Sequence, residues 1–110
     1  MDAEVLVVLI TVPTMEIGET IAQHLLDRRL AACVNILPGV RSIYSWGGEI
    51  NDDQELLLIV KTRMQLFQEQ LIPAVQSLHP YDVPEILALP VVQGNRDYLD
   101  WVTRETEPQR

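Results

Sequence analysis

The sequence is poor in cysteine. Cys33 is the single thiol among 110 residues, so no intramolecular disulfide can form. Small domains that fold in oxidising compartments usually contain several disulfides, whereas thiols stay reduced in the cytoplasm. We therefore expect a reducing compartment, and the cytoplasm is the simplest assignment.

Positive charge is also scarce. The chain has 8 Lys and Arg residues against 16 Asp and Glu residues, which gives a formal net charge of -8. Such a surface repels the phosphates of nucleic acids and of anionic lipid headgroups. We expect neither a nucleic acid nor a membrane as a partner.

Long hydrophobic runs are absent as well. The apolar run from Val5 to Ile10 is far shorter than the roughly 20 residues that a membrane-spanning helix needs. It follows Asp2 and Glu4 instead of a basic stretch, so it is not typical of a signal peptide. The hydrophobic content of 47% is enough for one core, and we expect a single domain over residues 1–110.

Hydrophobic periodicity predicts alternating strands and helices. Segments rich in Leu and β-branched residues predict strands, and apolar residues that recur every three or four positions predict helices. The expected strands are 4–12, 33–46, 49–60 and 85–92. The expected helices are 16–30, 64–78 and a last one that follows Asn95 and carries Tyr98, Leu99, Trp101 and Val102.

Local signals refine these boundaries. Thr14 and Asn95 belong to the residue types that favour the N-cap position of a helix. Pro38-Gly39 predicts a bulge or bend in the second strand, and Gly47-Gly48 predicts a tight hairpin turn. We expect residues 51–53 to be irregular, because they would lie opposite the Pro-Gly bend.

Proline interrupts the second half of the chain. Pro73 cannot donate a hydrogen bond to Glu69, so the second helix should kink or restart there. The two prolines of segment 79–84 predict a loop. No pattern continues after Thr103, so we expect residues 104–110 to form a frayed tail.

The order β-α-β-β-α-β defines the fold class. It is α+β, a ferredoxin-like sandwich with both crossover helices on one face of a four-stranded sheet, here with a long second hairpin and a C-terminal helix. A strand of about 14 residues spans roughly 45 Å, so the hairpin should extend beyond the domain. Tyr44 and Trp46 near its turn are typical of interfaces, and the alternative is that they pack within their own subunit.

The two central strands are apolar on both faces. Because side chains alternate, the runs at 5–10 and 56–60 place Val, Leu and Ile on either side of the sheet. Two helices cover one face only, and monomers rarely expose an apolar patch as large as the other face. We expect copies of the chain to cover it around a symmetry axis. The expected interface residues are Leu6, Val8, Tyr44, Trp46, Leu57, Ile59 and Trp101.

Several motifs resemble those of one known family, in that family's order. They are Leu30-Ala31-Ala32-Cys33-Val34-Asn35, Ser42-Ile43-Tyr44-Ser45-Trp46, Lys61-Thr62, His79-Pro80-Tyr81, Pro84-Glu85-Ile86 and Tyr98-Leu99-Asp100-Trp101. Over nearly its whole length the chain is similar to the CutA divalent-cation tolerance family. The resemblance implies a ferredoxin-like protomer, a very stable homotrimer, kinship with PII-type signalling trimers, and copper binding as in some members.

Transition metal ions favour imidazole, thiolate and carboxylate donors. The candidates in this chain are Cys33, His79, Asp82, Glu85 and His24. His24 is the weakest of them, because it shares a polar helix face with Thr20, Gln23 and Asp27 and is expected to be solvated. The expected topology puts Cys33 and His79 at opposite ends of a subunit, so the two cannot share an ion there. Some copper-binding relatives are similar but carry Cys where Ile10 stands and His where Leu78 stands. We expect no required cofactor, with copper or another divalent metal ion as the candidate ligand.

A structural interpretation competes with the metal site. In this interpretation, His79 caps the C-terminus of the second helix and Glu85 accepts hydrogen bonds from loop amides. Cys33 is then a small buried hydrophobic residue. Nucleotide-binding glycine loops and nucleophile elbows are absent from the sequence, so we do not expect an enzyme. Two hypotheses remain: a binding or regulatory trimer that takes a metal ion or small ligand in clefts between subunits, and a stable scaffold without a functional ligand.

Overall fold

The computed structural model describes residues 4–108. Its strands are β1 (Val5–Val12), β2 (Cys33–Trp46), β3 (Glu49–Arg63) and β4 (Ile86–Pro90). Its helical segments are α1 (Met15–Asp27), α2 (Met64–Leu66), η1 (Phe67–Leu71), α3 (Ile72–Leu78) and α4 (Arg96–Glu105). The predicted class, α+β with a ferredoxin-like order of elements, is confirmed.

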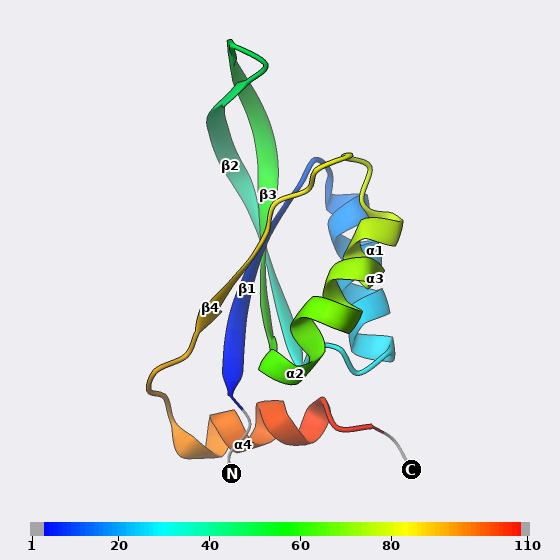
Figure 1. Cartoon of the computed structure of the whole chain (residues 1–110), viewed down its shortest axis with the longest axis vertical. Helices are drawn as coiled ribbons and strands as arrows, with labels where there is room; N and C mark the ends of the chain where they lie inside the picture. The colour runs from blue at the N-terminus through cyan, green and yellow to red at the C-terminus, as the bar shows by residue number, and fades with distance from the viewer. Residues whose placement is uncertain (1–3, 109–110) are drawn as a thin grey trace.

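The four strands form one antiparallel sheet in the order β2-β3-β1-β4. Figure 1 shows α1 and α3 together on one face of this sheet, with α4 across its lower end and the β2–β3 hairpin extending upward beyond the other elements. The long hairpin gives the molecule its principal extents of 46 × 28 × 23 Å.

The core lies between the sheet and the helices. Its β1 members are Leu6, Val8, Ile10 and Val12, which pack with Leu58 and Val60 of β3 and with Ile21, Leu25, Leu71 and Val75 of the helices. Leu6 and Val8 are thus buried between the sheet and the helices of the same chain, and the prediction that they are interface residues on the uncovered face is wrong. The predicted alternation of the β1 side chains is confirmed. Because both alternating sets of side chains are apolar, the sequence could not indicate which set faces the helices.

The second face of the sheet has no helix over most of its area, and we call it the open face. Val7 pairs with Lys61, and Leu9 pairs with Ile59 on one side and Leu87 on the other, so these residues share that face. The apolar residues of the open face are Val7, Leu9, Leu37, Leu57, Ile59, Leu87 and Leu89, and Leu87 is 56% exposed. Leu57 and Ile59 therefore lie on the open face as predicted.

The predicted bulge in β2 is present. Leu37 pairs with Leu57 and Val40 pairs with Glu55, so β2 contains one more residue than β3 at this point. The extra residue switches which β2 side chains face the open side, from odd-numbered positions before the bulge to even-numbered positions after it. Residues 51–53 pair regularly with β2, so the predicted irregularity there is wrong.

The turn of the hairpin and the N-caps follow the sequence signals. Gly47 and Gly48 have φ values of +61° and +83°, which side chains rarely adopt. The Thr14 hydroxyl accepts a hydrogen bond from the Ile17 amide, and the Asn95 side chain accepts one from the Asp97 amide. The first helix, predicted to reach Leu30, ends earlier, at Asp27.

The second predicted helix is divided into α2, η1 and α3. The η1 segment has π-helical hydrogen bonding, and Pro73 lies in the first turn of α3. Leu71 keeps helical dihedrals, and the Ile72 amide bonds the Phe67 carbonyl, so the helical run continues through this region. The predicted restart at Pro73 is therefore wrong, and the wider π-helical turn accommodates the proline within a continuous run.

The C-terminal segment is more ordered than its sequence suggested. Helix α4 continues to Glu105, and Thr106 is 1% exposed. Arg29 donates hydrogen bonds to the carbonyls of residues 104 and 107, and Arg63 donates to the hydroxyl and carbonyl oxygens of Thr106 at 2.8 Å each. The frayed tail predicted from residue 104 is wrong for residues 104–107, while residues 109–110 lie outside the described part of the chain.

These arginine contacts predict a local loss of stability on substitution. Arg63→Ala removes both bonds to Thr106 and leaves its carbonyl without that donor, which should cost roughly 1–2 kcal/mol. Hydrogen exchange of the amides at residues 103–107 should become faster. Arg28→Ala removes the same charge from an exposed position and should leave this exchange unchanged. Equal exchange in both variants would contradict the role assigned to Arg63.

Candidate functional site

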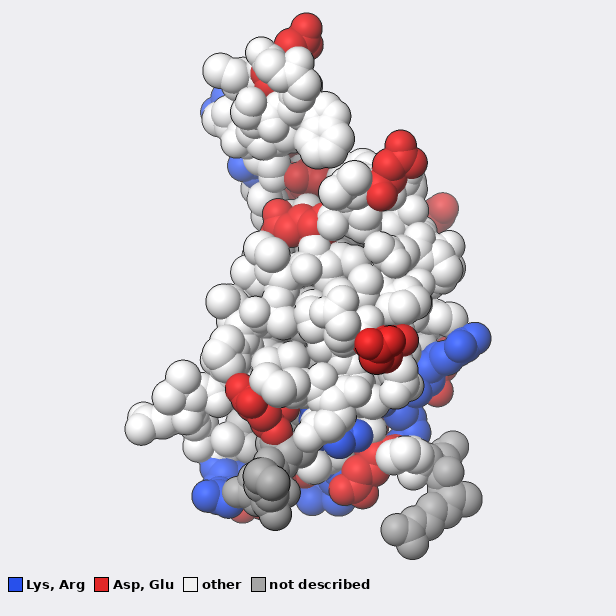
Figure 2. Space-filling view, viewed as in Figure 1, with Lys and Arg blue, Asp and Glu red and all other residues white. Residues whose placement is uncertain are grey.

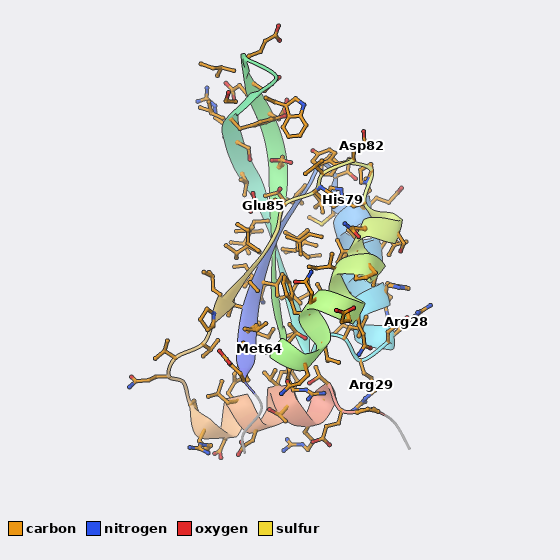
Figure 3. All side chains as sticks on the ribbon, viewed as in Figure 1. Arg28, Arg29, Met64, His79, Asp82 and Glu85 are labelled. Atoms are coloured by element: carbon orange, nitrogen blue, oxygen red, sulfur yellow. The ribbon has the colours of Figure 1, made fainter. Side chains whose placement is uncertain are left out.

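The predicted metal ligands do not converge. Cys33 begins β2 at the end of the sheet near α4, with its sulfur 4.0 Å from the Lys61 ammonium nitrogen. His79, Asp82 and Glu85 lie together at the other end, along the loop that joins α3 to β4 (Figure 3). The expectation that Cys33 cannot share an ion with His79 in one subunit is confirmed.

The imidazole of His79 is engaged at both nitrogens. The side chain is 7% exposed; Nδ1 accepts a hydrogen bond from the Tyr81 amide at 3.2 Å, so Nε2 carries the hydrogen and donates to the Thr11 carbonyl at 2.8 Å. These bonds tie the loop to the end of β1. Coordination of a metal ion by His79 would require one of them to break.

The chemistry of the remaining donors does not fit a preformed transition-metal centre. Among residues 4–108, no group of three His, Cys, Asp or Glu side chains is placed to hold one ion. Asp82 and Glu85 are exposed carboxylates, and two such ligands leave most coordination positions of a metal ion to water.

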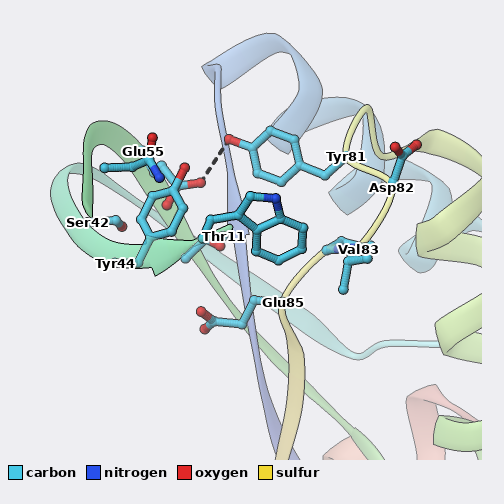
Figure 4. Close-up of a pocket in the computed structure, with 11 residues that line it drawn as sticks. Thr11, Ser42, Tyr44, Glu55, Tyr81, Asp82, Val83 and Glu85 are labelled. Carbon is cyan, nitrogen blue, oxygen red and sulfur yellow. Dashed lines mark hydrogen bonds between the residues drawn. The ribbon is translucent and has the colours of Figure 1, made fainter. Parts of the chain in front are cut away.

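A pocket of about 540 Å³ lies beside this loop (Figure 4). It is bounded by the upper hairpin, the end of β1 and the start of the segment that leads into β4. Its lining residues are Thr11, Ser42, Tyr44, Trp46, Asn51, Glu55, Tyr81, Asp82, Val83, Pro84 and Glu85. The volume falls within the usual range for small-molecule sites.

The bulge of β2 places the aromatic residues of this pocket. Tyr44 pairs with Asn51 and Ser42 pairs with Asp53, so these side chains lie on the same side of the hairpin as Glu55. Without the extra residue, the alternation of β2 would turn Tyr44 and Trp46 to the opposite side.

Two phenol–carboxylate hydrogen bonds hold the tyrosine rings. Tyr81 donates to Glu55 at 2.9 Å, drawn as a dashed line in Figure 4, and Tyr44 donates to Asp53. Burial and the bond to Glu55 raise the pKa of Tyr81 to about 12, and the bond to Asp53 raises the pKa of Tyr44. Both phenols therefore stay protonated at neutral pH.

The negative charge of the pocket comes from carboxylates. Glu55 is only 8% exposed, and Asp82 and Glu85 lie at the opening. Figure 2 shows Asp and Glu side chains in both the upper and the lower part of the molecule, whereas most Lys and Arg side chains lie near its lower end. Within residues 4–108, the pocket lining includes no lysine, arginine or histidine.

The sequence indicated only part of this site. Asp82 and Glu85 were predicted as ligands and Tyr44 and Trp46 as interface residues, and all four line the pocket. Glu55 was missed, because its partner Tyr81 is distant in sequence and the bulge decides which side of the hairpin it faces.

Fold and site together define a small ferredoxin-like protein with an acidic, aromatic pocket at one end of its open face. A family model described as "CutA1 divalent ion tolerance protein" matches residues 6–105. The chain belongs to this CutA1 divalent ion tolerance family, as its motifs indicated.

Relatives of known name and structure agree with this assignment. The chain is 59% identical over 100 residues to the divalent-cation tolerance protein CutA of Thermus thermophilus, covering 91% of this chain and 96% of that protein. It is 46% identical over 102 residues to human protein CutA, spanning 89% of this chain but only 54% of the human protein. The structure of CutA1 from Oryza sativa superposes with a TM-score of 0.92 at 44% identity, covering 98% of each chain.

The family description and the name of the Thermus thermophilus relative refer to tolerance of divalent ions, and neither names an enzyme class. Within residues 4–108, no helix is long and apolar enough to cross a bilayer.

The phenol–carboxylate bonds predict a pH dependence. Because folding raises the pKa of Tyr81 above 10, its bond to Glu55 stabilises the fold fully below about pH 10, and this contribution is lost as the pH rises toward 12. In Glu55→Gln the pKa of Tyr81 should fall, because the carboxylate charge is removed, and should stay above 10, because burial remains the larger cause.

Absorbance at 295 nm measures this ionisation, and Tyr81→Phe identifies the contribution of Tyr81 among three tyrosines. Glu19→Gln on the exposed side of α1 removes an equal charge and should leave the titration unchanged. Identical curves for Glu55→Gln and the parent protein would contradict the assigned coupling.

Proposed function

We propose that this chain is a homotrimeric binding or regulatory protein of the divalent-cation tolerance class, with ligand sites in clefts between its subunits. Its open face is the observation that carries the proposal. That face has apolar residues from all four strands, and Leu87 and Leu89 on the edge strand are more than half exposed in the isolated chain. Subunits that pack their open faces around a symmetry axis remove this surface from water.

The hairpin supports the same assembly. Its upper part exposes Ile43, Trp46 and Ile50, with Ile50 82% exposed, far from the core of its own subunit. A neighbouring subunit offers these side chains the apolar contact that their own subunit does not. The pocket then lies close to the subunit boundary, because Trp46 contributes to both.

The trimer predicts a native mass of about 37 kDa, three times the 12.5 kDa of one chain. Analytical ultracentrifugation at micromolar concentration measures it directly. A well-folded species of 12.5 kDa would contradict the proposal.

Charges on the open face should break the assembly. Leu87→Glu combined with Leu89→Glu would place carboxylates in the interface, and we expect the mass to fall toward that of one chain. Leu26→Glu changes an exposed leucine on α1, away from the open face, and should leave the mass unchanged. An intact trimer in the double variant would show that the interface lies elsewhere.

Copper or another divalent ion is the proposed metal ligand, held weakly and without being required. Asp82 and Glu85 are the proposed first contacts, since His79 is engaged in hydrogen bonds and Cys33 lies at the far end. Exposed carboxylates at the opening of an acidic pocket attract cations, but few fixed donors limit affinity to about micromolar or weaker.

Calorimetric titration with copper tests this site. Asp82→Asn combined with Glu85→Gln should abolish the saturable heat, because both carboxylates are neutralised. Glu19→Gln combined with Asp100→Asn removes the same charge elsewhere and should retain it. Heat that persists in the first variant and disappears in Cys33→Ser would place the metal at Cys33.

We assign no catalytic role to the chain and propose a cytoplasmic location, in keeping with its single free thiol. The alternative is a trimer whose stability is its main property, or one that takes a small ligand without a metal. Of these two alternatives, the pocket favours the trimer that binds a small ligand without a metal. Its volume and its combination of polar and apolar lining residues are typical of a small-molecule site.

A further inference from the structure

The pocket on the open face combines two kinds of group that recognise positive charge. Tyr44, Trp46 and Tyr81 contribute three aromatic rings, and Glu55, Asp82 and Glu85 contribute three carboxylates. The rings come from the hairpin and from the α3–β4 loop, so they approach the cavity from two sides (Figure 4). This composition differs from that of a simple acidic patch, because apolar surface lines the cavity between the charges.

Aromatic faces and carboxylates attract different parts of an organic cation. A quaternary or alkylated ammonium group is attracted to the electron-rich faces of Trp and Tyr, and its alkyl carbons gain by leaving water. Carboxylates at the opening add a longer-range attraction for the same charge. The lining therefore suits a cation that carries apolar substituents.

Other ligand classes fit less well. An anion would meet three carboxylates with no lysine, arginine or histidine among the described lining residues. A bare divalent ion would find too few converging donors within residues 4–108. A neutral apolar molecule would fill the cavity but would leave the buried Glu55 and the carboxylates at the opening without a counter-charge.

The two tyrosine rings are held in place before any ligand arrives. Tyr81 is fixed at its hydroxyl by Glu55 and at its amide by His79, whose ring lies 4.7 Å from the tyrosine ring. Tyr44 is fixed by Asp53. Ordered rings lose little conformational freedom on binding, which favours recognition of a small ligand.

We propose that this pocket binds an organic cation with an alkylated ammonium headgroup, with the aromatic rings around its alkyl groups and Glu55, Asp82 and Glu85 balancing its charge. The inference deepens the proposed function and rests on it in one respect, that the protein binds a ligand. It names a ligand class that differs from a metal ion in size, hydration and binding groups.

Choline and its neutral isostere 3,3-dimethyl-1-butanol provide a matched pair of probes. The chain has two tryptophans, so ¹⁵N-labelled protein gives two indole signals, and Trp46→Phe identifies the one that belongs to Trp46. Choline should shift the Trp46 signal saturably and leave that of Trp101 unchanged. The neutral alcohol should bind about tenfold more weakly, because it lacks the charge.

Substitution of one carboxylate tests the source of the affinity. Glu85→Gln should weaken choline binding about threefold to tenfold, whereas Glu19→Gln, with the same charge change on α1, should leave it within about twofold. Both glutamates are exposed, so neither change should prevent folding. Equal affinity for choline and the alcohol, or choline binding that does not shift the Trp46 signal, would overturn the inference.

The outcome is separable from that of the proposed function. A trimer of about 37 kDa whose Trp46 signal responds to copper but not to choline would retain the proposed function and overturn this inference. A 12.5 kDa species whose Trp46 signal responds to choline and not to the alcohol would support the inference and overturn the trimer.

Discussion

The architecture depends on one constraint, the apolar character of both faces of the central strands. β1 and β3 place Val8, Ile10 and Val60 against the helices, and the same alternation puts Leu9 and Ile59 on the open face. Helix α4 covers only the lower end of that face, where the side chain of Arg63 reaches Thr106. An exposed apolar surface of this kind is typical of a contact surface, and the pocket lies next to it.

A single extra residue in β2 links the fold to the site. The bulge between Leu37 and Val40 changes the alternation of the strand, so the aromatic residues of the upper hairpin share a side with Glu55. The same strand thus contributes to the core near its start and to the pocket near its end. Bulges that redirect side chains in this way are frequent next to functional sites.

The His-Pro-Tyr motif at residues 79–81 has a physical role that does not require a metal. His79 bonds the end of β1 and the Tyr81 amide, and Tyr81 in turn bonds Glu55 of β3. This chain of hydrogen bonds fixes the loop that closes one side of the pocket. Membership of a divalent ion tolerance family is therefore compatible with a site whose shape and charge suit a larger cation.

The sequence by itself determined the order of elements, the caps at Thr14 and Asn95, the glycine turn and the bulge, because these depend on local backbone preferences. Only the tertiary structure decided which face of β1 meets the helices, where the last helix ends, and that Glu55 and Tyr81 meet. The physical reason is that these features depend on contacts between segments far apart in the chain. A strand that is apolar on both faces gives no local signal for the face that meets the helices. A polar C-terminal segment without a periodic pattern likewise gives no local signal for the contacts that order it.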